Sequence, residues 1–177
     1  MKLYWPLIPL LFFIALAVFF WRGLSLEPQH LPSVLIGKTI PPFQLPDLND
    51  EHTLFTSNLL QGKTTLLNVW ASWCAACSEE QVFLLQLARQ GVPLYGLNYK
   101  DNPKDATRWL AEWGNPYKRT GNDLNGKVAI ELGVYGTPET FLIDAQGVIQ
   151  YRHAGPLNDE VWTREFLPRI KALEKTA

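Results

Sequence analysis

The two cysteines of this chain lie three residues apart at a point where a buried strand is followed by a helix, and no other feature limits the possible folds as much. The strand is indicated by residues 64–70, TTLLNVW, a largely apolar run typical of a strand covered on both faces. A helix is predicted over 75–90, because Gly91 is placed to end it. Cys74 and Cys77 therefore stand at the start of that helix. The step from buried strand to helix indicates an α/β fold.

Strands and helices alternate along most of the remaining chain. This alternation predicts a mainly parallel sheet covered on both faces. Further strands are expected at 93–99 and in two hairpins, 43–45 with 53–55 and 139–143 with 148–153. Further helices are expected at 103–113, 125–132 and 159–175, the last bent at Pro168. After the first hairpin, the predicted order is a βαβ unit, an extra helix and a ββα unit.

The N-terminal segment is the most apolar part of the chain. The 19 residues from Leu3 to Trp21 carry no charge, and as a helix they would extend about 28 Å, close to the hydrocarbon core of a bilayer. A cleaved signal peptide is the alternative, because residues 15–17, Ala-Leu-Ala, have the form of a cleavage site, but apolar residues continue beyond them. We expect a transmembrane signal anchor over 1–21, a proline-containing linker over 22–34 and one folded domain over 35–177.

The charges of the chain and its cysteine count limit what it can bind and where it lies. The 177 residues hold 16 Lys and Arg against 17 Asp and Glu, a net charge of -1, so no basic surface for nucleic acid is expected. Two cysteines cannot build a multi-bridge disulfide scaffold or a four-thiolate zinc site. Lys2 and the free amino terminus slightly favour an N-terminus in the cytoplasm, which would place the folded domain on the opposite side of the membrane.

The cysteine spacing at the start of a helix brings the two sulfurs within bonding distance. At the helix N-terminus, unpaired amide groups and the helix dipole favour a thiolate on Cys74. Cys74 is therefore expected to attack a target disulfide, and Cys77 to resolve the mixed disulfide.

Three other uses of the pair are weighed against this one. A purely structural disulfide would close a ring of four residues, which stabilises by only roughly 2 kcal/mol. A metal site would need two more ligands, and His30, His52 and His153 are not in a paired spacing. Two inert buried thiols are not expected, because the residues beside them are polar and indicate the rim of the domain: Ser72, Ser78, Glu79 and Glu80.

Five stretches of the sequence together carry a family resemblance: IGKTIPPFQL, GKTTLLNVWASWCAACSEE, LNYKDNPKDATRWLAEWGNPY, GVYGTPETFLID and YRHAGPLN. In order and spacing they resemble the DsbE (CcmG) family of bacterial cytochrome c maturation. The resemblance implies a thioredoxin fold with an N-terminal β-hairpin and an inserted helix, preceded by one transmembrane helix. It also implies a single-pass protein of the bacterial inner membrane with its catalytic domain in the periplasm.

The same resemblance implies an activity and partners. Members of the family reduce the haem-binding CxxCH cysteines of apocytochrome c, directly or through a partner thiol protein of cytochrome c maturation. Their electrons come from a transmembrane donor of the DsbD/CcdA type. No cofactor beyond the redox-active disulfide Cys74–Cys77 and no metal is expected.

The resemblance assigns roles to residues around the pair. Cys74 becomes the exposed nucleophile and Cys77 the resolving cysteine. Pro138 matches the cis-proline that faces the pair in thioredoxin folds, although trans is the default for an X-Pro bond. Thr137 would offer its backbone to an extended substrate segment, or is a plain turn residue. Trp73 is expected to be exposed, and Trp70 to pack in the core.

Two glutamates match acidic residues that line the groove beside the cysteines in this family. Glu80 follows Cys77 by three residues on the predicted helix, so a carboxylate there can raise a thiol pKa or carry its proton. Glu139 follows the proline. The alternative for both is a solvated glutamate. Asn68 stands where ordinary thioredoxins carry a buried aspartate, and a neutral amide cannot accept a proton, so that work would fall to the glutamates.

Other functions for the pair are an oxidant that installs disulfides, a thiol peroxidase, and a metal or haem chaperone. An oxidant needs a more stabilised thiolate than a pair beside two carboxylates suggests. Thiol peroxidases resembling peroxiredoxins carry a threonine three residues before the reactive cysteine, where this chain has Ala71. The dipeptide Ala75-Ala76 lacks the proline of many relatives, which leaves the redox potential open.

Overall fold

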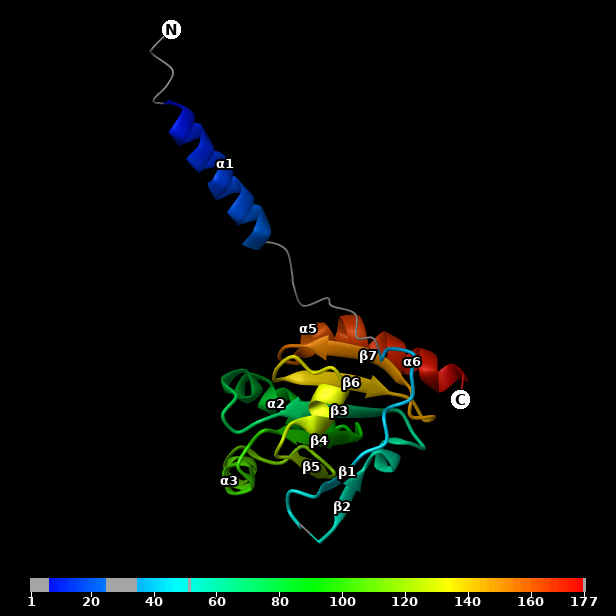
Figure 1. Cartoon of the computed structure of the whole chain (residues 1–177). Helices are drawn as coiled ribbons and strands as arrows, with labels where there is room; N and C mark the ends of the chain where they lie inside the picture. Colours follow the sequence, from blue (N-terminus) through cyan, green and yellow to red (C-terminus); the bar gives the residue numbers. More distant parts are fainter. Residues whose placement is uncertain (1–6, 25–34, 51, 177) are drawn as a thin grey trace. The chain divides into compact units, whose positions relative to one another are not determined.

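The computed structural model describes residues 7–24, 35–50 and 52–176 (Figure 1). The chain divides into two compact units, Met1–Leu31 and Pro32–Ala177. The division falls within residues 22–34, the expected linker, most of which lies outside the described residues.

The described part of the first unit is one helix, α1 (Leu7–Leu24). Nearly all of its described side chains are exposed. Among the residues that the structure describes, no helix is both long enough and apolar enough to cross a membrane. The transmembrane anchor over 1–21, of which residues 1–6 lie outside the described part, stays a prediction from the sequence.

The second unit is built on a five-stranded mixed sheet with the order β5-β4-β3-β6-β7. Its strands are β3 (Thr65–Trp70), β4 (Leu94–Tyr99), β5 (Thr120–Asp123), β6 (Glu139–Ile143) and β7 (Ile149–Ala154). Strand β4 runs parallel to β3 and β5, whereas β6 is antiparallel to β3 and β7. The expectation of a mainly parallel sheet is wrong, because β6 pairs antiparallel with both β3 and β7, which gives as many antiparallel pairings as parallel ones.

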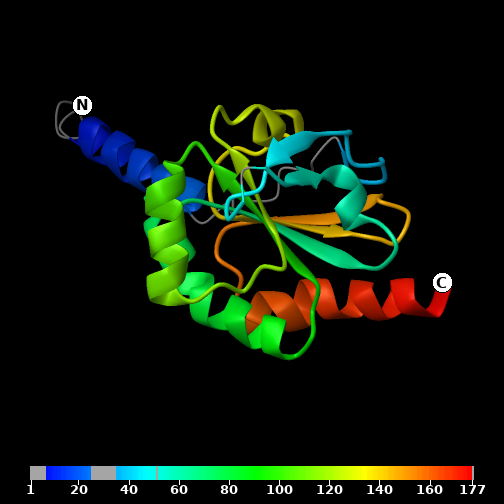
Figure 2. The same ribbon diagram turned by 90° about the horizontal axis from the view of Figure 1, so that it is seen from below.

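Helices and a second small sheet cover the two faces of this sheet (Figures 1 and 2). One face carries α2 (Ala75–Arg89), α3 (Pro103–Trp113) and the C-terminal helical segment. The other carries α4 (Lys127–Glu131), the hairpin of β1 (Gln44–Pro46) and β2 (Leu54–Thr56), and the 3-10 helix η1 (Ser57–Leu60). The α/β architecture and the N-terminal hairpin agree with the thioredoxin fold that the resemblance implied.

The alternation of side chains along β3 explains why the unit has two cores. Leu66 and Trp70 point to the α2 face, whereas Leu67 and Val69 point to the hairpin face. Asn68 shares the α2 face by the same alternation. All six residues of β3 are buried, as the apolar run predicted.

Strand β5 is not predicted by the sequence pattern. Its residues TGND are short and rich in types that strands disfavour. The strand forms because its backbone pairs with β4 from Thr120 to Asp123. Gly121 also lets the hairpin approach, since a Cβ there would lie 2.5 Å from the ring of Phe55.

The C-terminal helical segment contains an irregular turn. It consists of α5 (Asp159–Val161), the π-helical turn η2 (Trp162–Phe166) and α6 (Leu167–Thr176). Pro168 follows this turn by two residues. Proline lacks the amide donor and its ring crowds the carbonyl four residues earlier, which disfavours regular α-helix there. The expected bend at Pro168 is therefore a π-helical turn just before it.

Candidate active site

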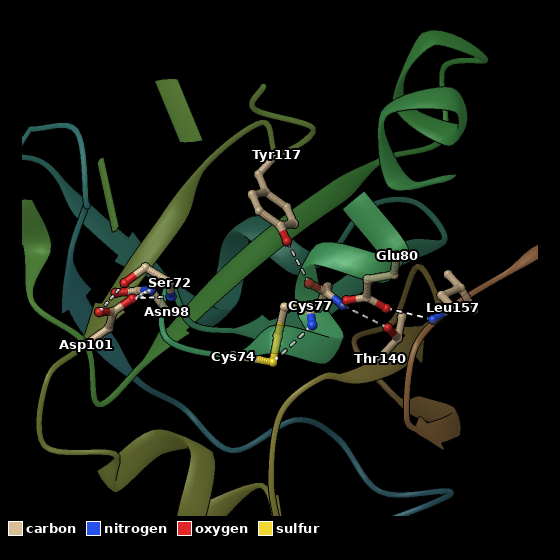
Figure 3. The surroundings of a disulfide bond; sticks show 10 residues. Ser72, Cys74, Cys77, Glu80, Asn98, Asp101, Tyr117, Thr140 and Leu157 are labelled. Atoms are coloured by element: carbon tan, nitrogen blue, oxygen red, sulfur yellow. Dashed lines mark hydrogen bonds between the residues drawn. A yellow bond between two sulfur atoms is a disulfide. The ribbon is translucent and has the colours of Figure 1, made fainter. Parts of the chain in front are cut away.

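The two cysteines form a disulfide at the N-terminus of α2 (Figure 3). Their Cα atoms lie 5.3 Å apart. Cys74 caps the helix, because its Sγ accepts a hydrogen bond from the backbone amide of Cys77 at 3.1 Å. The amide and the helix dipole would also favour negative charge on this sulfur after reduction. The placement expected from the spacing is confirmed.

The two sulfurs differ little in access in this oxidised state. Cys74 is 5% exposed and Cys77 is 2% exposed. The expectation of an exposed nucleophile is therefore wrong for the disulfide form, because both residues pack in the core that lies between the sheet and α2.

The tryptophans beside the pair lie as expected. Trp73 is 58% exposed, and its indole Nε1 donates to the carbonyl of Lys100 at 3.1 Å. Trp70 is buried, with ring centroids 5.1 Å from Trp109 and 5.7 Å from Tyr117.

The peptide bond between Thr137 and Pro138 is cis, as the resemblance implied. In the register of β3 and β6, Val69 lies opposite Glu139. The next residues outward, Trp70 and Pro138, are therefore at the same end of the sheet as the cysteines. The carbonyl of Pro138 accepts from the amide of Gly155 at 2.9 Å, which ties this loop to the end of β7.

Glu80 is buried beneath the cysteines instead of lying on a rim. It is 1% exposed, and both of its carboxylate oxygens accept hydrogen bonds (Figure 3). Oε1 accepts from Nδ2 of Asn68 at 2.9 Å, and Oε2 accepts from the backbone amide of Leu157 at 2.7 Å. Burial raises the pKa of Glu80 to about 7, although these two hydrogen bonds oppose the change. The alternative of a solvated glutamate is wrong.

Asn68 connects Glu80 to two residues that the sequence did not point to. Its Oδ1 accepts from the hydroxyl of Tyr117 at 2.7 Å, and its Nδ2 also donates to Oγ1 of Thr140 at 3.0 Å. Burial, and then the charge of Glu80, raise the pKa of Tyr117 well above its usual value. Tyr117 is thus held as a neutral donor, and Asn68 orients Glu80 without taking its proton.

Glu139 does not present a free carboxylate to a groove. It is 2% exposed, and its Oε2 accepts from Nε of Arg152, whose side chain is 4% exposed, at 2.7 Å. Its Oε1 accepts from the amides of Tyr135 and Gly136 at 2.8 and 3.2 Å. Glu139 therefore fastens the loop that leads into Pro138, and the alternative of a solvated charge is wrong here as well.

These groups together can perform thiol–disulfide exchange. Cys74 has the helix N-terminus to stabilise a thiolate, and Glu80 shares a helix face with Cys77, with a pKa near neutrality that suits proton transfer. In the part of the chain that the structure describes, His, Cys, Asp and Glu side chains nowhere gather in threes that could hold a metal ion.

Comparisons with known proteins agree with this chemistry. The Redoxin family model matches residues 35–166. The thiol:disulfide interchange protein DsbE of Pseudomonas fluorescens biotype C is 46% identical over 173 residues, which cover 98% of this chain and 97% of that protein. DsbE of Escherichia coli strain K12 is 45% identical over 177 residues, 97% of this chain and 96% of that protein. The solved structure of MTB dsbF has a TM-score of 0.62 at 25% identity, over 74% of this chain and 94% of that chain.

Proposed function

The chain belongs to the DsbE family of thiol:disulfide interchange proteins and is a thiol:disulfide oxidoreductase, and we propose that it is a membrane-anchored reductant in cytochrome c biogenesis. Its targets are the haem-site cysteines of apocytochrome c, reached directly or through a partner thiol protein. Cys74 attacks and Cys77 resolves.

The position of Glu80 favours reduction of the target over its oxidation. Buried Glu80 lies three residues after Cys77 on α2. When ionised, its carboxylate disfavours a thiolate nearby. Oxidants that install disulfides depend on a stabilised reduced form, so a carboxylate in this place favours a reductant.

The anchor and the location rest on the sequence. The uncharged run from Leu3 to Trp21 suits a signal anchor, and Lys2 before it suits a cytoplasmic N-terminus. A reductant outside the cytoplasm has no reducing thiol pool around it. Its electrons would then come from a transmembrane donor of the DsbD/CcdA type.

The redox equilibrium with glutathione tests the proposed direction. We expect the pair to have a potential below about -180 mV, so that it is largely oxidised in buffers where a disulfide-installing oxidant stays reduced. A potential near about -120 mV would instead identify an oxidant.

The substrate is tested with a disulfide-bonded CxxCH peptide. We expect its reduction to be faster than that of a peptide with the same residues in scrambled order. Equal rates would contradict selectivity for haem sites. Copper or haem bound stoichiometrically to the purified reduced protein would favour a chaperone that uses the pair as ligands.

A further inference from the structure

The turn that presents Cys74 is held at both of its central residues. The turn spans residues 71–74 and is closed by a hydrogen bond from the amide of Cys74 to the carbonyl of Ala71, at 3.2 Å. Ser72 and Trp73 are its central residues. Their orientation sets the position of Cys74, which follows them directly and caps α2.

Asp101, from the loop between β4 and α3, holds the first of these residues. Its carboxylate accepts from both the amide and the hydroxyl of Ser72, at 2.6 and 2.8 Å, and from Nδ2 of Asn98 at 2.9 Å (Figure 3). Asp101 is only 4% exposed. Burying a carboxylate is costly unless donors surround it, and here two of its three donors belong to the cysteine turn.

Lys100 holds the second residue through its backbone. Its carbonyl accepts from the indole of Trp73 at 3.1 Å. Lys100 has a φ of 46°, a left-handed conformation that a side chain of this kind rarely adopts. Its amide donates to the carbonyl of Asp123 at 3.0 Å, and Gly126 leaves room for it, since a Cβ there would lie 2.5 Å from Cε of Lys100.

We propose that residues 100 and 101 form a clamp for the cysteine turn, in which Asp101 and the carbonyl of Lys100 are positioning residues for attack by Cys74. The inference rests on the proposed role of Cys74. Both residues belong to the segment LNYKDN, which lies in one of the stretches that resemble the DsbE family. The exchange reaction of the two cysteines does not by itself assign a role to this segment.

The clamp acts on the first step of the exchange. The thiolate of Cys74 forms a bond to one sulfur of the target disulfide, and the other target sulfur leaves as a thiolate that takes a proton from water. Cys77 then bonds to Cys74, and its proton passes to the second target sulfur, which is released as a thiol, so two electrons pass from the pair to the target. Attack needs the three sulfurs in line, and the clamp fixes the direction in which the first sulfur points.

The test compares three variants of the full-length chain: Asp101→Asn, Ser72→Ala and the control Asp105→Asn. Asp105 is two residues into α3, exposed and paired with Arg108. The measurements are the rate constant for reduction of oxidised glutathione against pH, up to its plateau, and the thermal unfolding midpoint.

We expect Asp101→Asn to lower the plateau rate constant about tenfold. Ser72→Ala keeps the amide contact and should lower it about threefold. Asp105→Asn should leave it unchanged.

The plateau rate separates positioning from mere stabilisation. A lower unfolding midpoint for Asp101→Asn with an unchanged plateau rate would overturn the clamp. If that variant does not fold, an unchanged plateau for Ser72→Ala overturns it instead. Exchange that survives Cys74→Ser would overturn the role of Cys74 and the clamp together, whereas failure of the cytochrome proposal leaves these rates untouched.

Discussion

At the scale of single residues, a buried carboxylate next to a thiol pair works in two ways. Ionised Glu80 opposes the thiolates, and protonated Glu80 can return a proton. Its pKa of about 7 lies below the usual thiol pKa, so Glu80 is charged over most of a thiol titration.

Replacing Glu80 should therefore move that titration. In the reduced full-length chain, Glu80→Gln removes the charge on the face of α2 that carries Cys77, so we expect the thiol pKa to fall by about one unit. Thiolate absorbance against pH measures this. The control is Glu79→Gln, because Glu79 is adjacent but exposed.

The thiol titrations of wild type and Glu80→Gln should therefore differ. Superimposable curves for the two would show that Glu80 does not act on the cysteines. Glu139→Gln should change the titration less, because Glu139 is already paired with Arg152.

The same carboxyl should make stability depend on pH. Its pKa rises from 4.5 to about 7 on folding, so the folded chain binds the extra proton and is favoured below pH 4.5. That stability is lost as the pH rises to about 7, by an amount on the order of 3 kcal/mol at most. We expect the stability difference between wild type and Glu80→Gln, from urea unfolding at pH 4.5 and pH 8, to change by part of this amount. A constant difference would contradict the pKa.

The roles of the two cysteines are separable by trapping. Cys74 caps α2 and Cys77 lies within its first turn. We expect Cys77→Ser to accumulate mixed disulfides with targets, because nothing resolves them, and Cys74→Ser to accumulate none. Non-reducing electrophoresis of both variants measures this, and equal trapping would contradict the assignment.

Residue spacing predicted the part of this site that lies on one short segment, and the family resemblance added Asn68, Pro138 and Glu139. Tyr117, Thr140 and Leu157 were missed. Cys74, Cys77 and Glu80 share one turn-and-helix segment, so spacing alone relates them. Tyr117 reaches Asn68, and Leu157 reaches Glu80, only after the sheet has formed. Thr140 could have been found from the pairing of β3 with β6, but only with the register known.

At the scale of elements, the sequence predicted those with strong periodicity or capping. Helix α3 begins at Pro103 and ends at Trp113 as predicted, because Asn102 caps it, proline starts it and Gly114 stops it. Strand β5 has no such local signal. It forms through its pairing with β4 and its packing against the hairpin, which a local sequence pattern cannot show. The burial of Glu139 could not be predicted either, because Arg152 reaches it diagonally from the neighbouring strand.

The pair Glu139–Arg152 gives a prediction about β6 and β7. Arg152→Met would leave a buried carboxylate without its partner, and we expect it to cost about 3 kcal/mol or more of unfolding free energy. Adding Glu139→Gln should recover part of the loss, because the uncompensated charge is gone. Urea unfolding of the single and double variants measures this.

A surface pair is the control for that experiment. Arg164 contacts Glu160 at 2.7 Å, and both are exposed. Arg164→Met should cost no more than about 1 kcal/mol. Equal losses for Arg152→Met and Arg164→Met would show that the buried pair does not hold the loop before Pro138.

At the scale of the whole molecule, the proposed function needs the domain to be held where its targets are. A tether converts encounters with a membrane-bound assembly into encounters at high local concentration. The N-terminal apolar run would be the anchor, and the linker that contains Pro28 and Pro32 would be the tether.

The anchor predicts how the mature protein behaves in the cell. The apolar run continues through Val18 to Trp21, beyond the possible cleavage site at residues 15–17, so we expect the chain to keep its N-terminus and to stay in the membrane fraction after alkaline carbonate washing. A variant with Leu11→Arg and Ile14→Arg should leave that fraction, because each charge at the middle of the run opposes insertion by about 2.5 to 3.5 kcal/mol. The control places arginine at Gln29 in the linker and should remain with the membrane. N-terminal sequencing and fractionation measure both outcomes. A mature chain that begins at Val18 and is found in the wash would contradict the anchor, while leaving the exchange chemistry of Cys74 and Cys77 as it is.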